Sequence, residues 1–355
     1  MHINELLSKA IEMKASDIFI ISHHEVTFKI DGKLVTADDK MMKPEDTEQL
    51  IRQIYEQVNN KPIDGLLASG DDDFSFSLSG LGRFRVNTFR QRGTFGAVIR
   101  TILFELPDPQ VLNIPQPVLD LSNTSNGLVL VTGPAGSGKS TTLACIIDQI
   151  NQKRSGHIIT MEDPIEYIHR HKQCIVTQRE VPSDTLSYVT ALRAALRQSP
   201  NVLLLGEMRD LETMTAAETG LLVLSTLHTM GAANTIDRII DVFPHNQQQQ
   251  IRIQLSMVLK GVVSQQLLRA TNGKQVPAFE IMLSNLAIQN MIREEKIHQI
   301  ESAIFSGTKT GMTTMDSSLI KLYQEGLISE QDAILHSNNY DSMKQRIQNM
   351  PKPQV

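Results

Sequence analysis

The sequence predicts an α/β protein with an N-terminal mixed α+β domain, a core built on a parallel sheet, and a C-terminal helical region. Between residues 127 and 228, short apolar runs alternate with helical stretches. That alternation is typical of parallel strands joined by crossover helices. Before residue 105, strand-like and helical segments are mixed, and beyond about residue 283 only helical patterns remain.

The bulk composition indicates a globular chain of two domains without a membrane span. The chain has 355 residues, of which 41% are hydrophobic, enough for a sizeable core. No apolar run approaches the roughly 20 residues that cross a bilayer. The N-terminus, with its early Glu5, lacks a signal-peptide pattern. We therefore expect a soluble, cytoplasmic protein whose membrane contact, if any, is peripheral.

Charge and cysteine content argue against two further classes of protein. The net charge is −5 and the pI is about 6.1, so we expect no nucleic-acid partner, although a local basic patch is compatible with these values. Cys145 and Cys174 lie outside any CxxC or Cys/His cluster. We therefore expect a reducing compartment, no disulfide framework and no zinc site.

The N-terminal domain is predicted over residues 1–105. Residues 43–58 within it have helical periodicity and an acidic first turn. A linker is expected over 106–126, because four prolines and an Asn/Ser cluster favour an extended segment. The core then spans 127–283 and the helical region 284–355. The strand-like runs of the N-terminal domain, expected in a partly antiparallel sheet, are "DIFII", "VTFKIDGKL", "DFSFSLSG" and "GRFRVNTF".

The C-terminal region carries helix patterns and a helix-start signal. Residues 286–304 are amphipathic. In "SEQDAIL", Ser329 and Asp332 have the spacing of a capping box. The tail "NMPKPQV" is expected to fray.

The most specific local motif is a glycine-rich loop between a strand and a helix, in "GLVLVTGPAGSGKST". Gly133, Gly138, Lys139 and Ser140 fit the pattern G-x-x-x-x-G-K-[ST]. Its glycines let backbone N–H groups turn onto phosphate oxygens, and the new helix adds a positive dipole end. Lys139 is expected to reach the β- and γ-phosphates of ATP, and the Ser140 hydroxyl to ligate Mg²⁺. The predicted cofactor-binding residues here are Gly133, Pro134, Ala135, Gly136, Ser137, Gly138, Lys139, Ser140 and Thr141.

Three further apolar runs of the core end in polar residues. "HIITME" ends at Glu162 and is followed by Asp163 and Glu166, "VLLLGE" ends at Glu207, and "LVLSTLH" ends at His228. Ligands of open α/β sheets bind beyond the carboxyl ends of the strands. A single strand-end carboxylate is usually a helix cap or a solvated turn residue. Three strands that each end in a polar residue, at the sheet edge that carries the glycine loop, favour an active site.

Charge suggests a role for each of these side chains. Glu207 is the first candidate for polarising the attacking water. Glu162, with help from Asp163 or Glu166, is the candidate for a second, metal-side carboxylate. His228 is expected to sense the γ-phosphate through a hydrogen bond, and the alternative is a histidine satisfied by backbone groups. The predicted catalytic residues are Glu207, Glu162, Glu166 and His228, and the predicted metal ligands are Ser140, Glu162 and Asp163.

Arginines supply the opposite charge, and four of them cluster in "GRFRVNTFRQRG". Arg83 and Arg85 are two residues apart and share a face of a strand. One interpretation is a phosphate-neutralising set acting across a subunit interface. Phe84 and Phe89 also allow a platform for single-stranded nucleic acid, or a solvated edge above a phenylalanine core. The predicted nucleotide-binding arginines are Arg83, Arg85, Arg90, Arg92, Arg193, Arg197 and Arg209.

Taken together, these motifs resemble those of the type IV pilus retraction ATPases, which drive twitching motility and form part of the secretion ATPase superfamily. The resemblance runs nearly from end to end. It is carried by "GRFRVNTFRQRG", "GPAGSGKSTT", "MEDPIEY", "LLLGEMRD", "TLHTMGAANTIDRIIDVFP" and "AIQNMIRE". In the last motif Gln289 stands where an arginine is expected, and Phe19 stands where a histidine is usual.

The resemblance implies a PAS-like N-terminal domain, a RecA-like ATPase core and a homo-hexameric ring. It also implies that ATP and Mg²⁺ bind between the two domains and that N-terminal arginines complete a neighbouring site. The partners it implies are an inner-membrane pilus platform protein and, indirectly, pilin, at the cytoplasmic face of the inner membrane. Carried over residue by residue, it assigns Lys139 and Ser140 to Mg·ATP, and Glu162, Asp163 and Glu166 to the acidic box. It assigns Glu207 to the Walker B motif, His228 to the His box, and Arg83 to Arg92 to the set that faces a neighbouring subunit.

Three alternatives stay open at this point. The first is a competence or type II secretion-type assembly ATPase. Extension ATPases of the same superfamily usually carry a long extra N-terminal region and a four-cysteine zinc site, and their lack in this sequence favours retraction, but short competence and secretion ATPases also lack the extra region. An accessory nucleotide-gated ring subunit with weak hydrolysis is the second alternative. A nucleic-acid motor is the third, and the acidic net charge argues against it.

Overall fold

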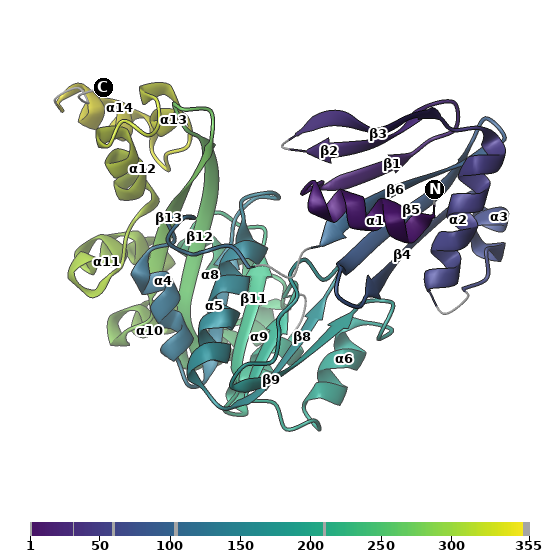
Figure 1. The fold of residues 1–355 in the computed structure, drawn as a ribbon. Coiled ribbons are helices and arrows are strands. Elements are labelled where there is room, and N and C mark those ends of the chain that lie inside the picture. The colour runs from purple at the N-terminus through teal and green to yellow at the C-terminus, as the bar shows by residue number, and fades with distance from the viewer. Residues whose placement is uncertain (1, 31, 59–60, 103–105, 209–210, 351–355) are drawn as a thin grey trace. The chain divides into compact units, whose positions relative to one another are not determined.

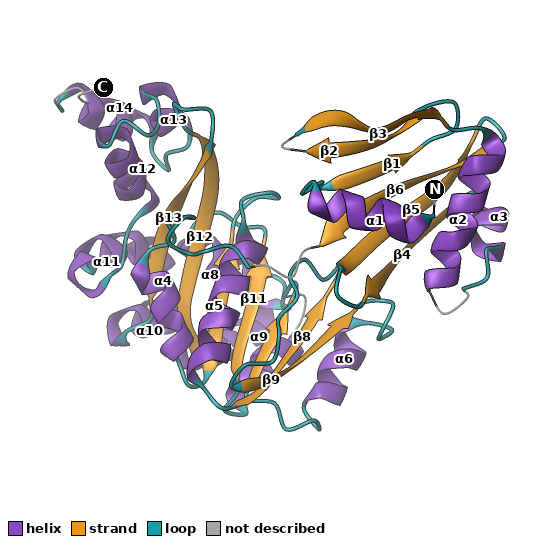
Figure 2. Cartoon of the chain, viewed as in Figure 1, coloured by secondary structure: helices purple, strands orange, loops and turns teal. Residues whose placement is uncertain are grey.

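The computed structural model describes residues 2–30, 32–58, 61–102, 106–208 and 211–350. The chain divides into two compact units, each with its own sheet (Figure 1). The first comprises Met1–Leu106 and Glu166–Ile168, and the second comprises Pro107–Ile165 and His169–Val355. Helices and strands occur in both units (Figure 2), so the predicted α/β class is confirmed.

The described residues of the first unit form an antiparallel sheet and three helices. In chain order its elements are α1 (Ile3–Glu12), β1 (Asp17–Ile20), β2 (Glu25–Ile30), β3 (Lys33–Met41), α2 (Pro44–Gln57), α3 (Asp64–Ser69), β4 (Asp71–Leu78), β5 (Gly82–Gln91) and β6 (Thr94–Ile102). The strand order is β3-β2-β1-β6-β5-β4, and each of these described pairs is antiparallel. Apolar residues of the three helices pack against Ile18, Phe28, Val86 and Ile99 of the sheet.

Two details of this unit differ from the sequence-based expectation. The run "VTFKIDGKL" forms parts of two strands, because β2 ends at Ile30 and β3 begins at Lys33. Gly32, with φ of +78°, adopts the left-handed backbone that such a tight turn requires. The strand β6 was not among the predicted runs, although its Ala97 and Ile99 are fully buried.

The second unit contains a seven-stranded sheet in the order β13-β12-β7-β11-β10-β8-β9. Its strands are β7 (Gly127–Thr132), β8 (Gly156–Glu162), β9 (Cys174–Glu180), β10 (Val202–Leu205), β11 (Leu222–Leu227), β12 (Leu259–Arg269) and β13 (Gln275–Leu283). All of the described pairs are parallel except β12 with β13. The predicted parallel core is therefore confirmed, and β9, β12 and β13 extend it.

Helices cover both faces of this sheet, which explains why the central strands β7, β10 and β11 are almost continuously apolar. The helices are α4 (Gln116–Asp120), α5 (Lys139–Lys153), α6 (Tyr188–Ala195), α7 (Leu211–Glu218), α8 (Ala232–Asp241), α9 (His245–Val258), α10 (Leu286–Arg293), α11 (Ile300–Ser306), α12 (Met315–Gln324), α13 (Glu330–Leu335) and α14 (Tyr340–Gln348), with short 3₁₀ turns at Leu121–Asn123, Ile297–Gln299 and Thr308–Thr310. Val129 and Val131 of β7 pack with α4 and α5, whereas Leu128 and Leu130 pack with α8 and α9. No helix in the described part of the chain is long and apolar enough to cross a membrane.

The segment expected to be an extended linker is partly helical and packed. Ile114, Val118 and Leu121 are buried in the same hydrophobic cluster as Leu143 and Ile147 of α5. Apolar residues between the prolines supply this contact. Pro117 lies in the first turn of the short helix α4, where proline is well tolerated because the first backbone N–H groups have no partner inside the helix.

The C-terminal region contains the predicted helices with one break. The amphipathic run 286–304 divides into α10 and α11, and Glu295 between them has φ of +63°. The helix start predicted at Ser329 is confirmed, because its side chain accepts a hydrogen bond from the N–H of Asp332. Residues 351–355 of the tail lie outside the described residues.

Candidate active site

The glycine-rich loop lies where the sequence predicts it, between β7 and α5. Gly133 has φ of +138° and Gly138 has φ of +87°. A Cβ atom on Gly133 would lie 2.1 Å from the carbonyl oxygen of Gln265, and one on Gly138 would lie 2.8 Å from Gln265 Nε2. Both φ angles favour glycine, and at Gly133 the backbone of Gln265 also leaves no space for a side chain.

Lys139 begins α5 with its ammonium group drawn into the loop. The side chain is 8% exposed, and Nζ donates hydrogen bonds to the carbonyl oxygens of Gly133 and Pro134, both at 2.9 Å. A buried ammonium needs such partners, because desolvation of an unpaired charge is costly. The loop thus combines a cation, a helix N-terminus and left-handed glycines, and this combination fits a phosphate chain.

Gln265 of β12 supports this loop and was missed by the sequence analysis. The hydroxyl of Thr142 in α5 donates to Gln265 Oε1 at 2.7 Å, and the Gln265 side chain is 4% exposed. The two residues are 123 positions apart. No local motif predicts such a contact; the nearest signal was the unassigned polar pair in "VVSQQLL".

Glu162 and Glu207 are brought together on neighbouring strands. The N–H of Gly206 donates to the carbonyl oxygen of Met161 at 2.8 Å. A Cβ on Gly206 would lie 3.6 Å from Glu162 Cα and 2.8 Å from the Tyr188 hydroxyl. Glycine before Glu207 therefore permits the close approach of β10 and β8 at their carboxyl ends.

The Glu162 carboxylate is held by residues of its own strand and of β9. Its Oε1 accepts from the Thr160 hydroxyl at 2.6 Å and from Gln178 Nε2 at 3.3 Å. Asp163 is exposed directly after β8. Glu166 is also exposed, and it belongs to the first unit, whereas Glu162 and Glu207 belong to the second.

The next strand end carries His228, which is exposed. β11 lies between β7 and β10 in the sheet, and the N–H of Gly133 donates to the carbonyl oxygen of Leu227 at 3.2 Å. His228 therefore follows the strand that separates the glycine loop from Glu207. The order along this edge is glycine loop, His228, Glu207 and Glu162, as the parallel arrangement predicts.

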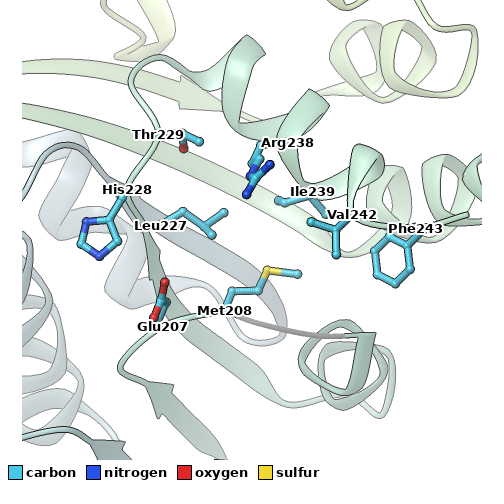
Figure 3. A pocket seen from close by; sticks show the side chains of 9 residues that line it. All are labelled: Glu207, Met208, Leu227, His228, Thr229, Arg238, Ile239, Val242 and Phe243. Carbon is cyan, nitrogen blue, oxygen red and sulfur yellow. The ribbon is translucent and has the colours of Figure 1, made fainter.

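A cavity of about 610 Å³ opens between these strand ends and α8. Figure 3 shows Glu207 and Met208 from the end of β10, His228 and Thr229 from the end of β11, and Arg238 pointing in from α8. Its wall is otherwise apolar: the remaining lining residues are Leu227, Ile239, Val242 and Phe243. Arg238 adds a positive charge to the cavity that Glu207 also lines, and the sequence analysis did not select it.

Arg83 and Arg85 alternate along β5 with the buried Phe84 and Val86, as their spacing predicts for one face of a strand. Arg85 forms an ion pair with Asp73 of β4, with 3.0 Å between NH2 and Oδ2. Arg83 NH1 lies 3.3 Å from the Ser77 hydroxyl. Phe84 on the opposite face is fully buried, and this disfavours the nucleic-acid platform, which requires an exposed ring.

The remaining arginines differ in their surroundings. Arg90 and Arg92 are exposed, and Arg90 lies 5.9 Å from the Phe95 ring centroid. Arg193 of α6 pairs with Glu212 of α7, and Arg197 is exposed just beyond α6. The seventh predicted arginine, Arg209, lies outside the described residues.

Metal ligands are sparse around the site. Within the described ranges, no group of three or more His, Cys, Asp or Glu side chains is close enough to hold a metal ion. Mg²⁺ in phosphate-transfer sites usually takes only one or two protein carboxylates and keeps waters and phosphate oxygens as its other ligands. Ser140, Glu162 and Asp163 fit that sparser kind of site. Cys145 and Cys174 are buried and unpaired.

A phosphate-binding loop on a parallel sheet, with carboxylates at neighbouring strand ends, defines a P-loop nucleotide-binding protein. Residues 1–351 match the model of the family described as Type II/IV secretion system protein, and the chain belongs to this family. The family resemblance predicted from the sequence is thereby confirmed.

The most similar relatives include proteins of type IV pili. The chain is 44% identical over 337 residues to the type IV pilus retraction ATPase PilT of Pseudomonas aeruginosa, covering 94% of this chain and 97% of that protein. It is 48% identical over 276 residues to a twitching motility protein of Neisseria gonorrhoeae, covering 76% and 74%. The crystal structure of the pilus retraction motor PilT with bound ADP matches with a TM-score of 0.88 and 46% identity, over 97% of this chain and 99% of that chain.

Proposed function

We propose that this chain is the ATP-hydrolysing subunit of a motor that powers type IV pilus retraction and twitching motility. The observation that carries the proposal is the match to PilT over nearly the full length of both chains. The glycine loop with its buried Lys139 and the paired strand-end carboxylates supply the groups that such a reaction needs.

The charge of each residue indicates its role at the phosphate chain of ATP. Lys139 and the loop N–H groups bind the phosphates, and Ser140, Glu162 and Asp163 would hold Mg²⁺. When bound, Mg²⁺ neutralises charge on the phosphate oxygens. Glu207 orients the attacking water, with Glu162 or Glu166 as the alternative base, and His228 hydrogen-bonds the γ-phosphate.

The active assembly under this proposal is a homo-hexameric ring at the cytoplasmic face of the inner membrane. The ring acts on a pilus platform protein and, through it, on pilin. Arginines of the first unit, Arg83 to Arg92, complete the site of a neighbouring subunit. The observation that supports this role is that Arg90 on β5 and Arg92 in the turn after it are both exposed.

Phosphate release from the purified chain with ATP and Mg²⁺ tests the catalytic part of the proposal. Lys139→Ala removes the main point charge on the phosphates, so less than a few per cent of the parent rate should remain, because lost electrostatic stabilisation commonly costs about 10²–10³-fold. Retention of most activity in Lys139→Ala would contradict the assignment of the loop. A parent that binds ATP but releases no phosphate would indicate a nucleotide-gated ring subunit.

A deletion strain tests the direction of the motor. Loss of a retraction ATPase should leave surface pili that cannot retract, visible as excess piliation with no twitching. A strain without pili would instead indicate an assembly ATPase. Stimulation of phosphate release by DNA would favour a nucleic-acid motor over both.

A further inference from the structure

Glu280 is a buried carboxylate to which the proposed reaction assigns no role. It lies on β13, is 3% exposed, and pairs across the β12–β13 ribbon with Ser264. Removing a carboxylate from water is costly unless hydrogen bonds replace the lost hydration. Burial accordingly raises the pKa of Glu280 above its ordinary value. The contacts of this side chain therefore indicate what its burial achieves.

Both carboxylate oxygens of Glu280 accept hydrogen bonds from the N-termini of helices. Oε1 accepts from the N–H of Ala232, the first residue of α8, at 2.7 Å. Oε2 accepts from the N–H of Met315, the first residue of α12, at 3.3 Å. The first N–H groups of a helix have no partner inside it, and the helix dipole adds positive charge there. One buried carboxylate thus joins two helix starts.

The start of α8 matters because the loop before it carries His228. Only residues 228–231 connect β11 to α8. The N–H of Gly231 donates to the Ser264 hydroxyl at 2.9 Å, next to the bond from Ala232 to Glu280. The cross-strand pair Ser264 and Glu280 therefore holds two consecutive amides at the end of this loop.

We propose that Glu280 is a positioning residue for ATP hydrolysis, which fixes the loop that presents His228 and joins this loop to the start of α12. The inference rests on the proposed ATPase function. Glu280 acts through the loop and not on the reacting atoms. A loop this short cannot move His228 far while its last amides stay bonded, and a displacement of α12 is passed to it through the same carboxylate.

Glu280→Gln in the full chain is the first test. Glutamine keeps one acceptor oxygen but presents an NH₂ group to the other helix start, so one of the two bonds is lost. We expect kcat for ATP to fall by about 10- to 100-fold, the scale of a small misplacement at a reacting centre. KM for ATP and the affinity for ADP should change by less than about two-fold, because the glycine loop is untouched.

Asp17→Asn is the control. Asp17 is also a buried carboxylate, 6% exposed, and its Oδ1 accepts from Arg100 Nε at 3.1 Å within the first unit. Asp316, although buried nearer to Glu280, is unsuitable because it follows Met315 in α12 and binds Asn338, which also contacts Glu280. Asp17→Asn should lower thermal stability but leave kcat within about two-fold. Equal losses of kcat in Asp17→Asn and Glu280→Gln would overturn the proposal.

A double-mutant cycle separates positioning from general destabilisation. If Glu280 acts through His228, Glu280→Gln should lower kcat by less than about two-fold further in a His228→Ala background, since coupled residues are not additive. Full additivity would contradict the proposal. Ser264→Ala removes the hydroxyl that accepts from the N–H of Gly231 and leaves the buried carboxylate in place. It should lower kcat several-fold, and it replaces Glu280→Gln as the test if the Glu280 variants do not fold.

Hydrogen exchange distinguishes failure of this inference from failure of the proposed function. Amides 229–232, measured without nucleotide, should exchange about ten-fold faster in Glu280→Gln than in the parent, because local opening becomes easier. Unchanged exchange would overturn the inference even in an active ATPase. Faster exchange in a chain whose parent releases no phosphate would support the role of Glu280 in holding the loop and refute the ATPase function.

Discussion

At the scale of single residues, Glu207 is the side chain on which the proposed chemistry depends most. Glu207→Gln keeps the shape of the residue and removes its charge. We expect nucleotide binding to persist and turnover to fall by about 10²–10⁴-fold, the usual loss for a general base or water-orienting group. Steady-state phosphate release and ADP binding measure the two effects. Normal hydrolysis by this variant would assign the base to Glu162 or Glu166.

His169 predicts a second effect, in the dependence of stability on pH. The side chain is 7% exposed, and burial lowers its pKa from 6.5 to about 4. As the pH falls below 6.5, the unfolded chain takes up the proton first, so the free energy of unfolding decreases until the pH approaches about 4. Between about pH 7.5 and about pH 5 the loss from this residue should be about 2 kcal/mol.

Denaturant unfolding of the parent and of His169→Leu at both pH values measures this contribution. The parent should lose about 2 kcal/mol more than the variant on acidification. His298→Leu, at an exposed histidine of the same unit, is the control and should follow the parent. Identical pH dependence in the parent and His169→Leu would show that folding does not lower the pKa of His169.

At the scale of elements, the approach of β10 to β8 depends on Gly206. In Gly206→Ala the new Cβ would meet the Tyr188 hydroxyl at 2.8 Å and the Met161 carbonyl oxygen at 3.4 Å. Overpacking of this kind costs about 1–3 kcal/mol, and it should shift Glu207 relative to Glu162 and lower kcat. Tyr188→Phe removes the hydroxyl, so the double variant should regain stability and rate. A double variant no better than Gly206→Ala would place the strain at Met161 instead.

Elements with a local signal were predicted, and those set by distant contacts were not. The glycine loop and the runs ending at Glu162, Glu207 and His228 are short patterns whose geometry follows from their own residues. The break after α10 was missed because Glu295 adopts φ of +63° without the glycine that usually marks such a position. β12 was missed because buried polar residues such as Ser264 and Gln265 interrupt its apolar pattern and because it follows α9 directly.

At the scale of the whole molecule, the contacts that organise the site cross long stretches of sequence. Thr142 bonds Gln265, and Ala232 bonds Glu280. Residue types alone gave no reason to select Gln265 or Glu280, since a glutamine or glutamate without a motif is usually solvated. The sequence could therefore predict the reacting groups at the sheet edge but not the β12–β13 ribbon that holds them.

The assembly itself predicts the outcome of a mixing experiment. If Arg83 to Arg92 act on a neighbouring subunit, a variant with all four arginines of this cluster changed to alanine and the Lys139→Ala variant should each be inactive alone. In a mixed ring, some sites combine the intact Lys139 of the arginine variant with intact arginines from a Lys139→Ala neighbour. With equal parts and random assembly, about a quarter of the sites qualify in a head-to-tail ring.

Recovery of phosphate release toward about a quarter of the parent rate on mixing would support action between subunits. Rings must exchange subunits for the test to apply, which energy transfer between labelled variants measures directly. Arg85 already pairs with Asp73 in its own subunit, so Asp73→Ala is the control for loss of that pair and should keep most activity. Exchange without recovery would mean that these arginines serve only the fold of the first unit, and the ring would then need another source of positive charge at the phosphates.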